Sequence, residues 1–370
     1  MKVGILTFPN SKSYGATLQM YALSHTVRKL GHDAEIVNYF SEYMKNEGHL
    51  LSSGKSRSLL ARLKKGASRL LHLRMKRGFS AFEKKRMTLY PKKQVSDRAL
   101  LPALSKRYDA LICGSDQVWN PDITNEDLSY FLDFCTEHTR RIAYAPSFGV
   151  RALSDGFAAR AGEQLALFNA LSVREEAGGA LVHRMIGKTP LTVVDPTMLV
   201  SREEWSALER AHPAASGEYI LYYTIRRSES LMARCRALSR KMGIRVVVVG
   251  GNALKRAKNS DPMLEYAVDP SPEEWLYLLH HARLVMTNSF HGTAFSIIYR
   301  KDFFVELSSA TNSRLEQITS MLGLESRVLQ SGREASGDLL STDACDYTEA
   351  ERCLDAMCAV SMDYLKKALS

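Results

Sequence analysis

The chain has 370 residues, of which 45% are hydrophobic and 24% are charged, as in an ordinary globular protein. This composition excludes disorder and collagen-like structure for the bulk of the chain, and the length favours two domains. No apolar run approaches the roughly 20 residues that span a bilayer, and the N-terminus lacks the apolar region and cleavage site of a signal peptide. We therefore expect a cytoplasmic protein.

Positive charge is concentrated in residues 51–107. The whole chain has a formal net charge of +10, yet this one segment holds seventeen Lys and Arg against two acids, so the remainder is net negative. Three interpretations stay open: a solvated face, a basic helix lying peripherally on an anionic membrane surface, or a site for an acidic polymer. Nucleic acid is disfavoured as a partner, because aromatic stacking residues are scarce there and no nucleic-acid motif occurs.

In the first half, residues 3–8 predict a buried strand, and a turn containing Gly15 leads into a helix over 16–30. Further strands are expected at 34–39, 110–113, 142–145 and 191–194, and another strand is expected to end at Val173. Helices are expected at 58–82, 154–169 and 175–184. This alternation of strands and helices is typical of a doubly wound domain.

The second half repeats the alternation after a connector at 201–217. Strands are expected at 219–224, 245–249, 284–286 and 303–305, with helices at 228–242, from the capping box at Ser271 to about His281, at 292–299, at 312–322 and from Tyr347 onward. The predicted fold class is α/β, with two Rossmann-like, GT-B-like domains facing a cleft. Their predicted bounds are 1–200 with the basic insertion, 218–345, and a C-terminal helix over 346–370 that packs back on the first domain.

The segment Thr287–Ala294 directly follows a predicted strand and runs into a helix. Backbone N–H groups at a helix N-terminus attract phosphate or carboxylate. The expected donor set comprises Asn288, Ser289, Gly292 and Thr293. His291 has the chemistry to bind a phosphate oxygen or to transfer a proton near neutral pH. The alternative is a capping turn with a solvent-facing histidine.

Arg174 follows the apolar strand end Leu171–Val173 and precedes two glutamates. An arginine at this end of a strand suits bidentate recognition of a carboxylate or phosphate. A surface Arg–Glu pair is the alternative.

The segment Cys113–Pro121 also follows a strand. Its side chains are of the types that hold a sugar by amide hydrogen bonds and ring stacking: Asp116, Gln117, Trp119 and Asn120. The alternative is an Asx-type turn with Trp119 packed in the core.

The first turn, Asn10–Gly15, is expected to form one side of the site for an acceptor substrate, through Asn10, Tyr14 and Gly15. Its lone glycine does not form the GxGxxG dinucleotide fingerprint. Arg314 is a further candidate, with a surface arginine as the alternative. The six cysteines form no CxxC pair, and no tight Cys/His group supplies four ligands, so we expect buried thiols and no metal.

Seven segments of the sequence, taken together, resemble the polysaccharide pyruvyl transferase family and occur in the family's order. No one of them is specific by itself. They are GILTFPNSKSYGATLQMYAL, YDALICGSDQVWNP, RRIAYAPSFG, LSVREEAG, VVDPTML, VMTNSFHGTAFSII and SRLEQITSMLGLESR. The basic segment 51–107 matches little that is characteristic. Gly15-Ala16 departs from the glycine–aspartate variant of the first turn, so no carboxylate role is expected there.

The resemblance implies a GT-B-like architecture and transfer of the enolpyruvyl unit of phosphoenolpyruvate to a sugar. The acceptor would be a cell-surface polysaccharide or its lipid-linked precursor, and the product a cyclic pyruvate ketal. By the resemblance, His291 is the catalytic or phosphate-contacting histidine, Arg174 binds the donor, and Arg314 is a further basic residue. We add Asp116 as the acceptor-side base. This chemistry requires no cofactor and no metal, since phosphoenolpyruvate is a substrate.

Two other functions remain as alternatives. One is a GT-B glycosyltransferase that uses a nucleotide sugar, although no glutamate precedes a glycine-rich helix turn to hold a ribose. The other is a non-catalytic protein that binds glycans or membranes through the basic segment.

Overall fold

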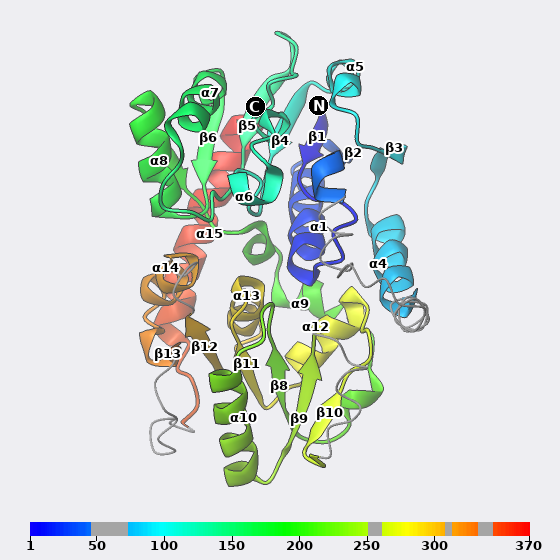
Figure 1. The fold of residues 1–370 in the computed structure, drawn as a ribbon, viewed down its shortest axis with the longest axis vertical. Coiled ribbons are helices and arrows are strands. Elements are labelled where there is room, and N and C mark those ends of the chain that lie inside the picture. Colours follow the sequence, from blue (N-terminus) through cyan, green and yellow to red (C-terminus); the bar gives the residue numbers. More distant parts are fainter. Residues whose placement is uncertain (46–72, 251–260, 308–312, 332–342) are drawn as a thin grey trace, which may run out of the picture. The chain divides into compact units, whose positions relative to one another are not determined.

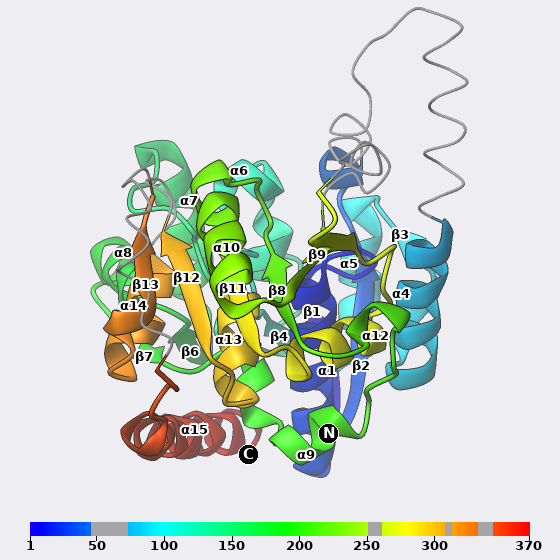
Figure 2. The ribbon, with the colours of Figure 1, turned by 90° about the horizontal axis from the view of Figure 1, so that it is seen from below.

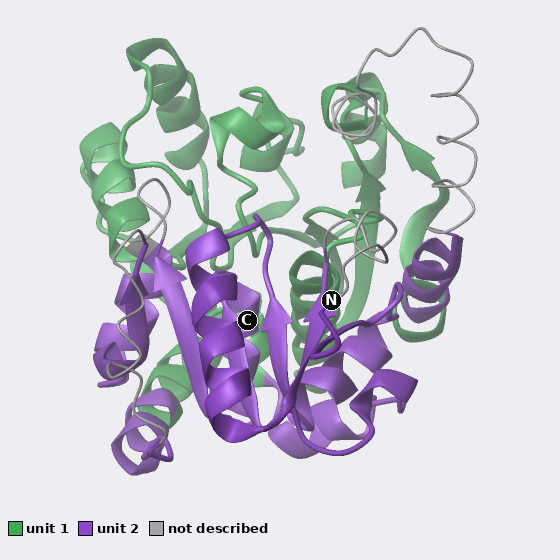
Figure 3. Ribbon diagram, turned by 60° about the horizontal axis from the view of Figure 1, so that its bottom comes forward, with its two compact units in different colours: residues 1–61, 83–199, 355–370 green, residues 62–82, 200–354 purple. Residues whose placement is uncertain are grey.

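The computed structural model describes residues 1–45, 73–250, 261–307, 313–331 and 343–370 (Figure 1). It divides into two compact units, residues 1–61, 83–199 and 355–370, and residues 62–82 and 200–354 (Figure 3). We refer to them as the N-terminal and the C-terminal unit. Most of the helix expected over 58–82 falls outside the described residues.

The N-terminal unit is built on a seven-stranded parallel sheet. Its strands are β1 (Lys2–Leu6), β2 (Asp33–Tyr39), β3 (Leu89–Val95), β4 (Ala110–Cys113), β5 (Arg140–Ala143), β6 (Ala170–Val173) and β7 (Leu191–Thr192). They lie in the order β3-β2-β1-β4-β5-β6-β7. The near-continuous apolar sequence of β1 and β4 follows from this arrangement, because a parallel sheet is buried on both faces.

The helices of this unit connect successive strands. They are α1 (Tyr14–Lys29), α5 (Leu101–Ser105), α6 (Pro121–Thr124), α7 (Asp155–Leu165) and α8 (Glu176–Ile186). Two helices contain unit boundaries, α4 (Leu73–Arg86) and α15 (Thr348–Leu369). No described helix is both long and apolar enough to cross a membrane.

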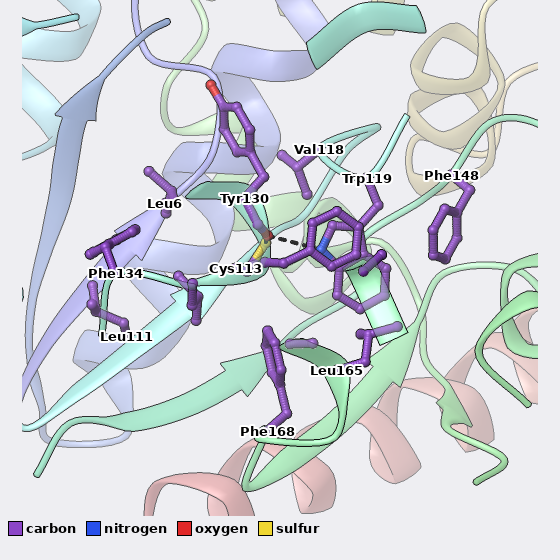
Figure 4. Close-up of a cluster of buried hydrophobic side chains, with 14 of the residues drawn as sticks. Leu6, Leu111, Cys113, Val118, Trp119, Tyr130, Phe134, Phe148, Leu165 and Phe168 are labelled. Atoms are coloured by element: carbon purple, nitrogen blue, oxygen red, sulfur yellow. Dashed lines mark hydrogen bonds between the residues drawn. The ribbon is translucent and has the colours of Figure 1, made fainter. Parts of the chain in front are cut away.

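An aromatic cluster fills the core between the sheet and the helices of the N-terminal unit (Figure 4). The indole of Trp119 stacks on Phe131, with ring centroids 5.1 Å apart, and its Nε1 donates a hydrogen bond to the carbonyl of Tyr130 at 2.9 Å. Cys113 is buried in the same cluster. All six cysteines are free thiols, but only Cys113 and Cys235 are buried, so the expectation of buried thiols is wrong for the other four, which are partly exposed.

The C-terminal unit has a six-stranded parallel sheet in the order β10-β9-β8-β11-β12-β13. The strands are β8 (Tyr219–Tyr223), β9 (Arg245–Val249), β10 (Leu264–Tyr266), β11 (Leu284–Thr287), β12 (Phe303–Leu307) and β13 (Val328–Gln330). The helices are α9 (Arg202–Ser206), α10 (Glu229–Met242), α12 (Pro272–His280), α13 (Phe290–Ile298) and α14 (Ser313–Met321). Helix α10 packs on one face of the sheet and buries Leu231, Cys235 and Leu238 against it (Figure 2).

Both sheets follow the doubly wound order, in which the chain starts in the middle, runs to one edge and then returns to build the other half. The predicted α/β class with two Rossmann-like domains is therefore confirmed. The order reverses between β1 and β4 in one sheet and between β8 and β11 in the other, and ligands of such sheets bind at these switch points, beyond the carboxyl ends of the strands.

Candidate functional site

At the switch point of the N-terminal sheet, the loops after β1 and β4 are tied together by hydrogen bonds. The hydroxyl of Thr7 donates to the carbonyl of Ser115 at 3.1 Å. The buried amide of Gln19 on α1 donates to the Thr7 hydroxyl at 2.9 Å and accepts from the Ser115 N–H at 3.2 Å. The same hydrogen bonds therefore fix the starts of two predicted segments, residues 10–15 and 113–121.

Arg174 lies in a buried cluster of charges beside these loops, only 5% exposed. Its Nη1 donates to the Asp195 carboxylate at 2.9 Å, its Nη2 lies 3.7 Å from Asp116 Oδ1, and its Nε lies 3.7 Å from Glu175 Oε2. Burial by itself lowers the pKa of Arg174, but the charges of Asp195, Asp116 and Glu175 outweigh burial and raise it. The structure thus brings together Arg174 and Asp116, and the alternative of a surface Arg–Glu pair is wrong.

Asp195 is a component of this cluster that the sequence analysis did not single out. Its Oδ1 accepts bonds from the Thr197 N–H at 3.0 Å and the Thr197 hydroxyl at 2.8 Å, while its Oδ2 accepts from Ser115 at 3.3 Å and from Arg174. Four hydrogen bonds hold this buried carboxylate in one orientation, so it fixes the guanidinium of Arg174. Its signals in the sequence were the Asp-Pro dipeptide after an apolar strand and the segment VVDPTML, which contains it.

The segment after β4 divides into core and partly exposed residues. Asp116 and Gln117 are partly exposed, whereas Trp119 is completely buried. The Asn120 side chain caps α6 by accepting from the Asp122 N–H at 3.0 Å and donates to Gln117 Oε1 at 3.0 Å. A buried indole whose N–H is already bonded cannot stack on a sugar, so Trp119 belongs to the core, which is the alternative interpretation of this segment.

The first turn lies beside a buried carboxyl that sequence reasoning missed. The Asn10 N–H donates to Glu83 Oε1 at 3.2 Å, and the Asn10 amide donates to Asn38 Oδ1 at 3.0 Å. Burial raises the pKa of Glu83 to about 7, although the bond from Asn10 acts in the opposite direction. Tyr14 and Gly15 are buried in the first turn of α1. Glu83 escaped notice because it is one of two acids in a strongly basic segment.

In the C-terminal unit, hydroxyl groups build the turn that leads from β11 into α13. Ser289 is the N-cap: its hydroxyl accepts from the Gly292 N–H at 3.3 Å, and its own N–H donates to the Thr287 hydroxyl at 3.1 Å. The Thr293 hydroxyl donates to the Ser289 carbonyl at 3.1 Å. The predicted donors Gly292 and Thr293 therefore hold the turn together, a correction to the expectation that their protons face a ligand.

The same turn is fastened at the second switch point. Asn288 Oδ1 accepts from the Ile225 N–H at 3.0 Å, and its amide nitrogen donates to the Arg226 carbonyl at 2.8 Å, which joins the loops after β8 and β11. Gly292 is packed so closely that a Cβ there would lie 2.4 Å from Thr287 Oγ1. The backbone at the start of α13 is therefore held rigidly.

His291 lies in the first turn of α13 with 7% of its surface exposed, and its ring is perpendicular to that of Phe290 at a centroid distance of 5.2 Å. The alternative of a solvent-facing histidine is therefore wrong. Arg314 lies in the first turn of α14, half-buried, and α14 packs against α13. A histidine held at a helix N-terminus can contact an anion and exchange a proton with it.

A comparison with family models decides the family. The model of polysaccharide pyruvyl transferases matches residues 14–306, which include the loop after β4, the turn after β11, Arg174 and His291. The chain belongs to the polysaccharide pyruvyl transferase family. This membership makes it a transferase of polysaccharide biosynthesis. A search of curated proteins gives no match.

Solved structures with the same fold include two UDP-GlcNAc 2-epimerases. The enzyme from Methanocaldococcus jannaschii is 11% identical, with a TM-score of 0.53 and coverage of 96% of this chain and 99% of that one. The enzyme from Neisseria meningitidis, solved with UDP-GlcNAc bound, is also 11% identical, with a TM-score of 0.55 and coverage of 100% and 94%. At such identities the likeness concerns the fold alone, and it agrees with the predicted GT-B-like class.

Proposed function

We propose that this family member transfers the enolpyruvyl unit of phosphoenolpyruvate to a sugar of a cell-surface polysaccharide, or of its lipid-linked precursor, and forms a cyclic pyruvate ketal. The observation that carries the proposal is the family match over residues 14–306. The matched region contains the N-terminus of α13, a helix end of the kind that attracts anions, with His291 in its first turn. Phosphoenolpyruvate has a phosphate and a carboxylate, the two groups that such a helix end attracts.

The reaction balances with two sugar hydroxyls as the only co-reactants. A proton adds to the methylene carbon, which becomes a methyl group, and positive charge develops on the adjacent carbon. One hydroxyl oxygen bonds to that carbon, the carbon–oxygen bond to phosphate breaks, and the second hydroxyl closes the ketal ring. Of the two hydroxyl protons, one is balanced by the new methyl hydrogen and the other by the released phosphate.

On the donor side, we assign His291 to protonate or otherwise stabilise the departing phosphate. Asn288, Ser289, Gly292 and Thr293 act by fixing the backbone of the turn, so that the N-terminus of α13 is preorganised toward an anion. Arg314 is assigned as a further basic contact to the donor. General acid catalysis of this kind contributes about 10²–10⁴-fold.

On the acceptor side, we assign Asp116 as the base that takes a sugar proton, held in position by its ion pair with Arg174. The acceptor contacts assigned to the same unit are Asn10, Tyr14, Gly15, Gln117 and Asn120. Glu83 is a second candidate base, because a carboxyl whose pKa is about 7 is half-deprotonated at the operating pH.

Arg174 has two separable roles in this scheme. The family resemblance assigns it to the donor, whereas its ion pairs with three carboxylates assign it to the positioning of Asp116. Arg174→Lys separates them, since lysine keeps the charge but loses the planar fork. A donor contact predicts a raised KM for phosphoenolpyruvate, and a positioning role predicts a lower kcat with little change in KM.

The test is incubation with phosphoenolpyruvate and the acceptor glycan, with release of phosphate and formation of the ketal as readouts. His291→Ala should lower kcat about 10²–10⁴-fold, the contribution of one general acid. The matched control is His183→Ala, an exposed histidine on α8. Equal rates in wild type and His291→Ala would remove the assignment of His291.

Calorimetry with phosphoenolpyruvate and with UDP-sugars distinguishes this function from the nucleotide-sugar alternative. Binding of the UDP-sugar with no binding of phosphoenolpyruvate would overturn the proposal in favour of a glycosyltransferase.

A lipid-linked acceptor would place the enzyme at the cytoplasmic face of the cell membrane, and we propose peripheral contact through the basic segment 51–107. Its described part retains a cluster of basic residues on α4, namely Arg74, Lys76, Arg77, Lys84, Lys85 and Arg86. Binding to vesicles that contain anionic lipid should fall as salt rises. Binding that is absent, or indifferent to salt, would contradict membrane contact through this segment.

A further inference from the structure

Three side chains with metal-ligand chemistry converge within the C-terminal unit: Glu209 and, 71 residues further along the chain, the adjacent His280 and His281. One ligand atom of each lies within 4.8 Å of those of the other two. The histidines end α12 and precede β11, whereas Glu209 follows α9, the short helix that packs against α12. The cluster lies at the amino end of β11, and Ser289 and His291 lie past its carboxyl end.

Both imidazoles are held in place by ring stacking. His280 stacks on Tyr299 with centroids 4.2 Å apart, and His281 stacks on Tyr277 at 3.8 Å. His280 Nδ1 lies 2.8 Å from Glu209 Oε1. His281 Nδ1 lies 3.7 Å from Glu209 Oε2 and 3.0 Å from the Tyr277 carbonyl. An Nδ1–H that donates to this carbonyl orients the ring and leaves Nε2 as its metal-binding nitrogen.

The electrostatic surroundings favour a cation. The Glu209 side chain is only 8% exposed and supplies the carboxylate of the cluster. The carboxyl end of α12 adds the negative end of a helix dipole. Of the cations that line the adjoining cavity, Arg283 pairs with Asp302 and Arg300 with Glu351, whereas Lys301 adds a positive charge.

A route from solvent exists as well. His281 is exposed and lines a cavity of about 380 Å³, bounded by the residues that precede β8, β11 and β12. Of the three proposed ligands, His281 lines this cavity, and Glu209 and His280 lie behind it.

We propose that Glu209, His280 and His281 bind a divalent transition-metal ion. Two imidazoles and one carboxylate form a donor set typical of Zn²⁺, with water as the fourth ligand. Coordination replaces the contact between His280 Nδ1 and Glu209 Oε1 with bonds from both groups to the ion. The ion then fastens the end of α12 to the segment after α9 and stabilises the C-terminal unit. This site is independent of the proposed pyruvyl transfer, and the sequence analysis missed it because its ligands are 71 residues apart.

The test titrates ZnCl₂ into the full-length, metal-free protein by calorimetry with a competing chelator. Wild type should bind one Zn²⁺ per chain and unfold at a higher temperature with zinc present. His281→Ala, an exposed position that is expected to fold normally, should weaken binding at least about tenfold. Glu209→Gln should do the same, while the control His183→Ala should bind as wild type does.

Two results would overturn the proposal: no zinc binding by the wild type, or equal binding by wild type and both variants. The six free cysteines are the competing ligands, so Co²⁺ serves as a spectroscopic probe. Thiolate-to-cobalt charge-transfer absorption at one equivalent would assign the ion to cysteine and refute the site. Affinity for phosphoenolpyruvate should be unchanged in His281→Ala. The outcome of the zinc test is therefore independent of whether the proposed reaction is correct.

Discussion

The two units hold the loops at the carboxyl ends of their strands by different means. Besides the neutral bonds of Thr7, Gln19 and Ser115 at its switch point, the N-terminal unit has a buried charge cluster. In the N-terminal unit, one buried guanidinium is surrounded by the carboxylates of Asp195, Asp116 and Glu175. In the C-terminal unit, the corresponding turn is held by neutral hydroxyl, amide and backbone groups and by the close packing of Gly292. A turn without carboxylates suits an anionic ligand, whereas a turn rich in carboxylates suits hydroxyl groups. The proposed division, with the donor phosphate at the C-terminal turn and the sugar hydroxyls at the N-terminal loops, predicts such a difference between the two sites.

The largest expected effect is that of removing the one cation among three acids. Arg174→Ala leaves Asp195 and its neighbours without their counter-charge, and breaking a buried pair from one side costs about 3–5 kcal/mol. Urea unfolding should therefore show a large loss of stability. The control is Arg160→Ala on α7, whose partner Glu126 is on the surface and whose pair contributes about 0–1 kcal/mol. Equal losses in the two variants would refute the charge-based account of this unit.

The next effect concerns pH. The pKa of Glu83 is raised from 4.5 to about 7 by burial, so folding favours its protonated form. Its contribution to stability is fully present below pH 4.5 and is lost as the pH rises through 7, a change of about 3 kcal/mol. Glu83→Gln should match wild type near pH 4.5 and exceed it in stability at pH 8.

Unfolding measured from pH 4.5 to 8 checks this, with Glu163→Gln, an exposed position on α7, as the control. A wild-type profile that Glu83→Gln leaves unaltered would contradict the prediction.

The smallest effect tests the close packing of the other unit. In Gly292→Ala, the new methyl would lie 2.4 Å from Thr287 Oγ1 and 3.0 Å from Tyr223 Cδ1, and such overpacking costs about 1–3 kcal/mol. The same change at Gly156 of α7 meets no atom within 4 Å and should stabilise by about 0.5–1 kcal/mol. Melting temperatures that shift in the same direction for both would show that packing does not hold this turn.

Three strands that the sequence pattern did not predict show where this kind of prediction fails. No strand was expected at β3, β10 or β13, and each lies at the edge of its sheet. An edge strand is paired on one side only and can carry polar residues and proline, as in the LYPKKQV sequence of β3. The central strands were predictable because burial on both faces demands an apolar run.

The candidate site, like the fold, could be predicted only in part. Loops after central strands could be located from the pattern alone, and the capping box at Ser271 and the turn before α13 were visible as local motifs. Whether Trp119 faces solvent or the core could not be read, because that depends on Phe131 and Tyr130 on a different segment.

The amino-acid sequence by itself determined the parallel α/β alternation, the family and the two loops at which chemistry is expected, because these depend on local periodicity and contiguous motifs. Only the tertiary structure decided that Asp195 fixes Arg174, that Glu83 is buried beside Asn10, and that Glu209 meets two histidines. Those contacts join residues 21 to 73 positions apart, and the burial that sets their charges exists only once the chain has folded.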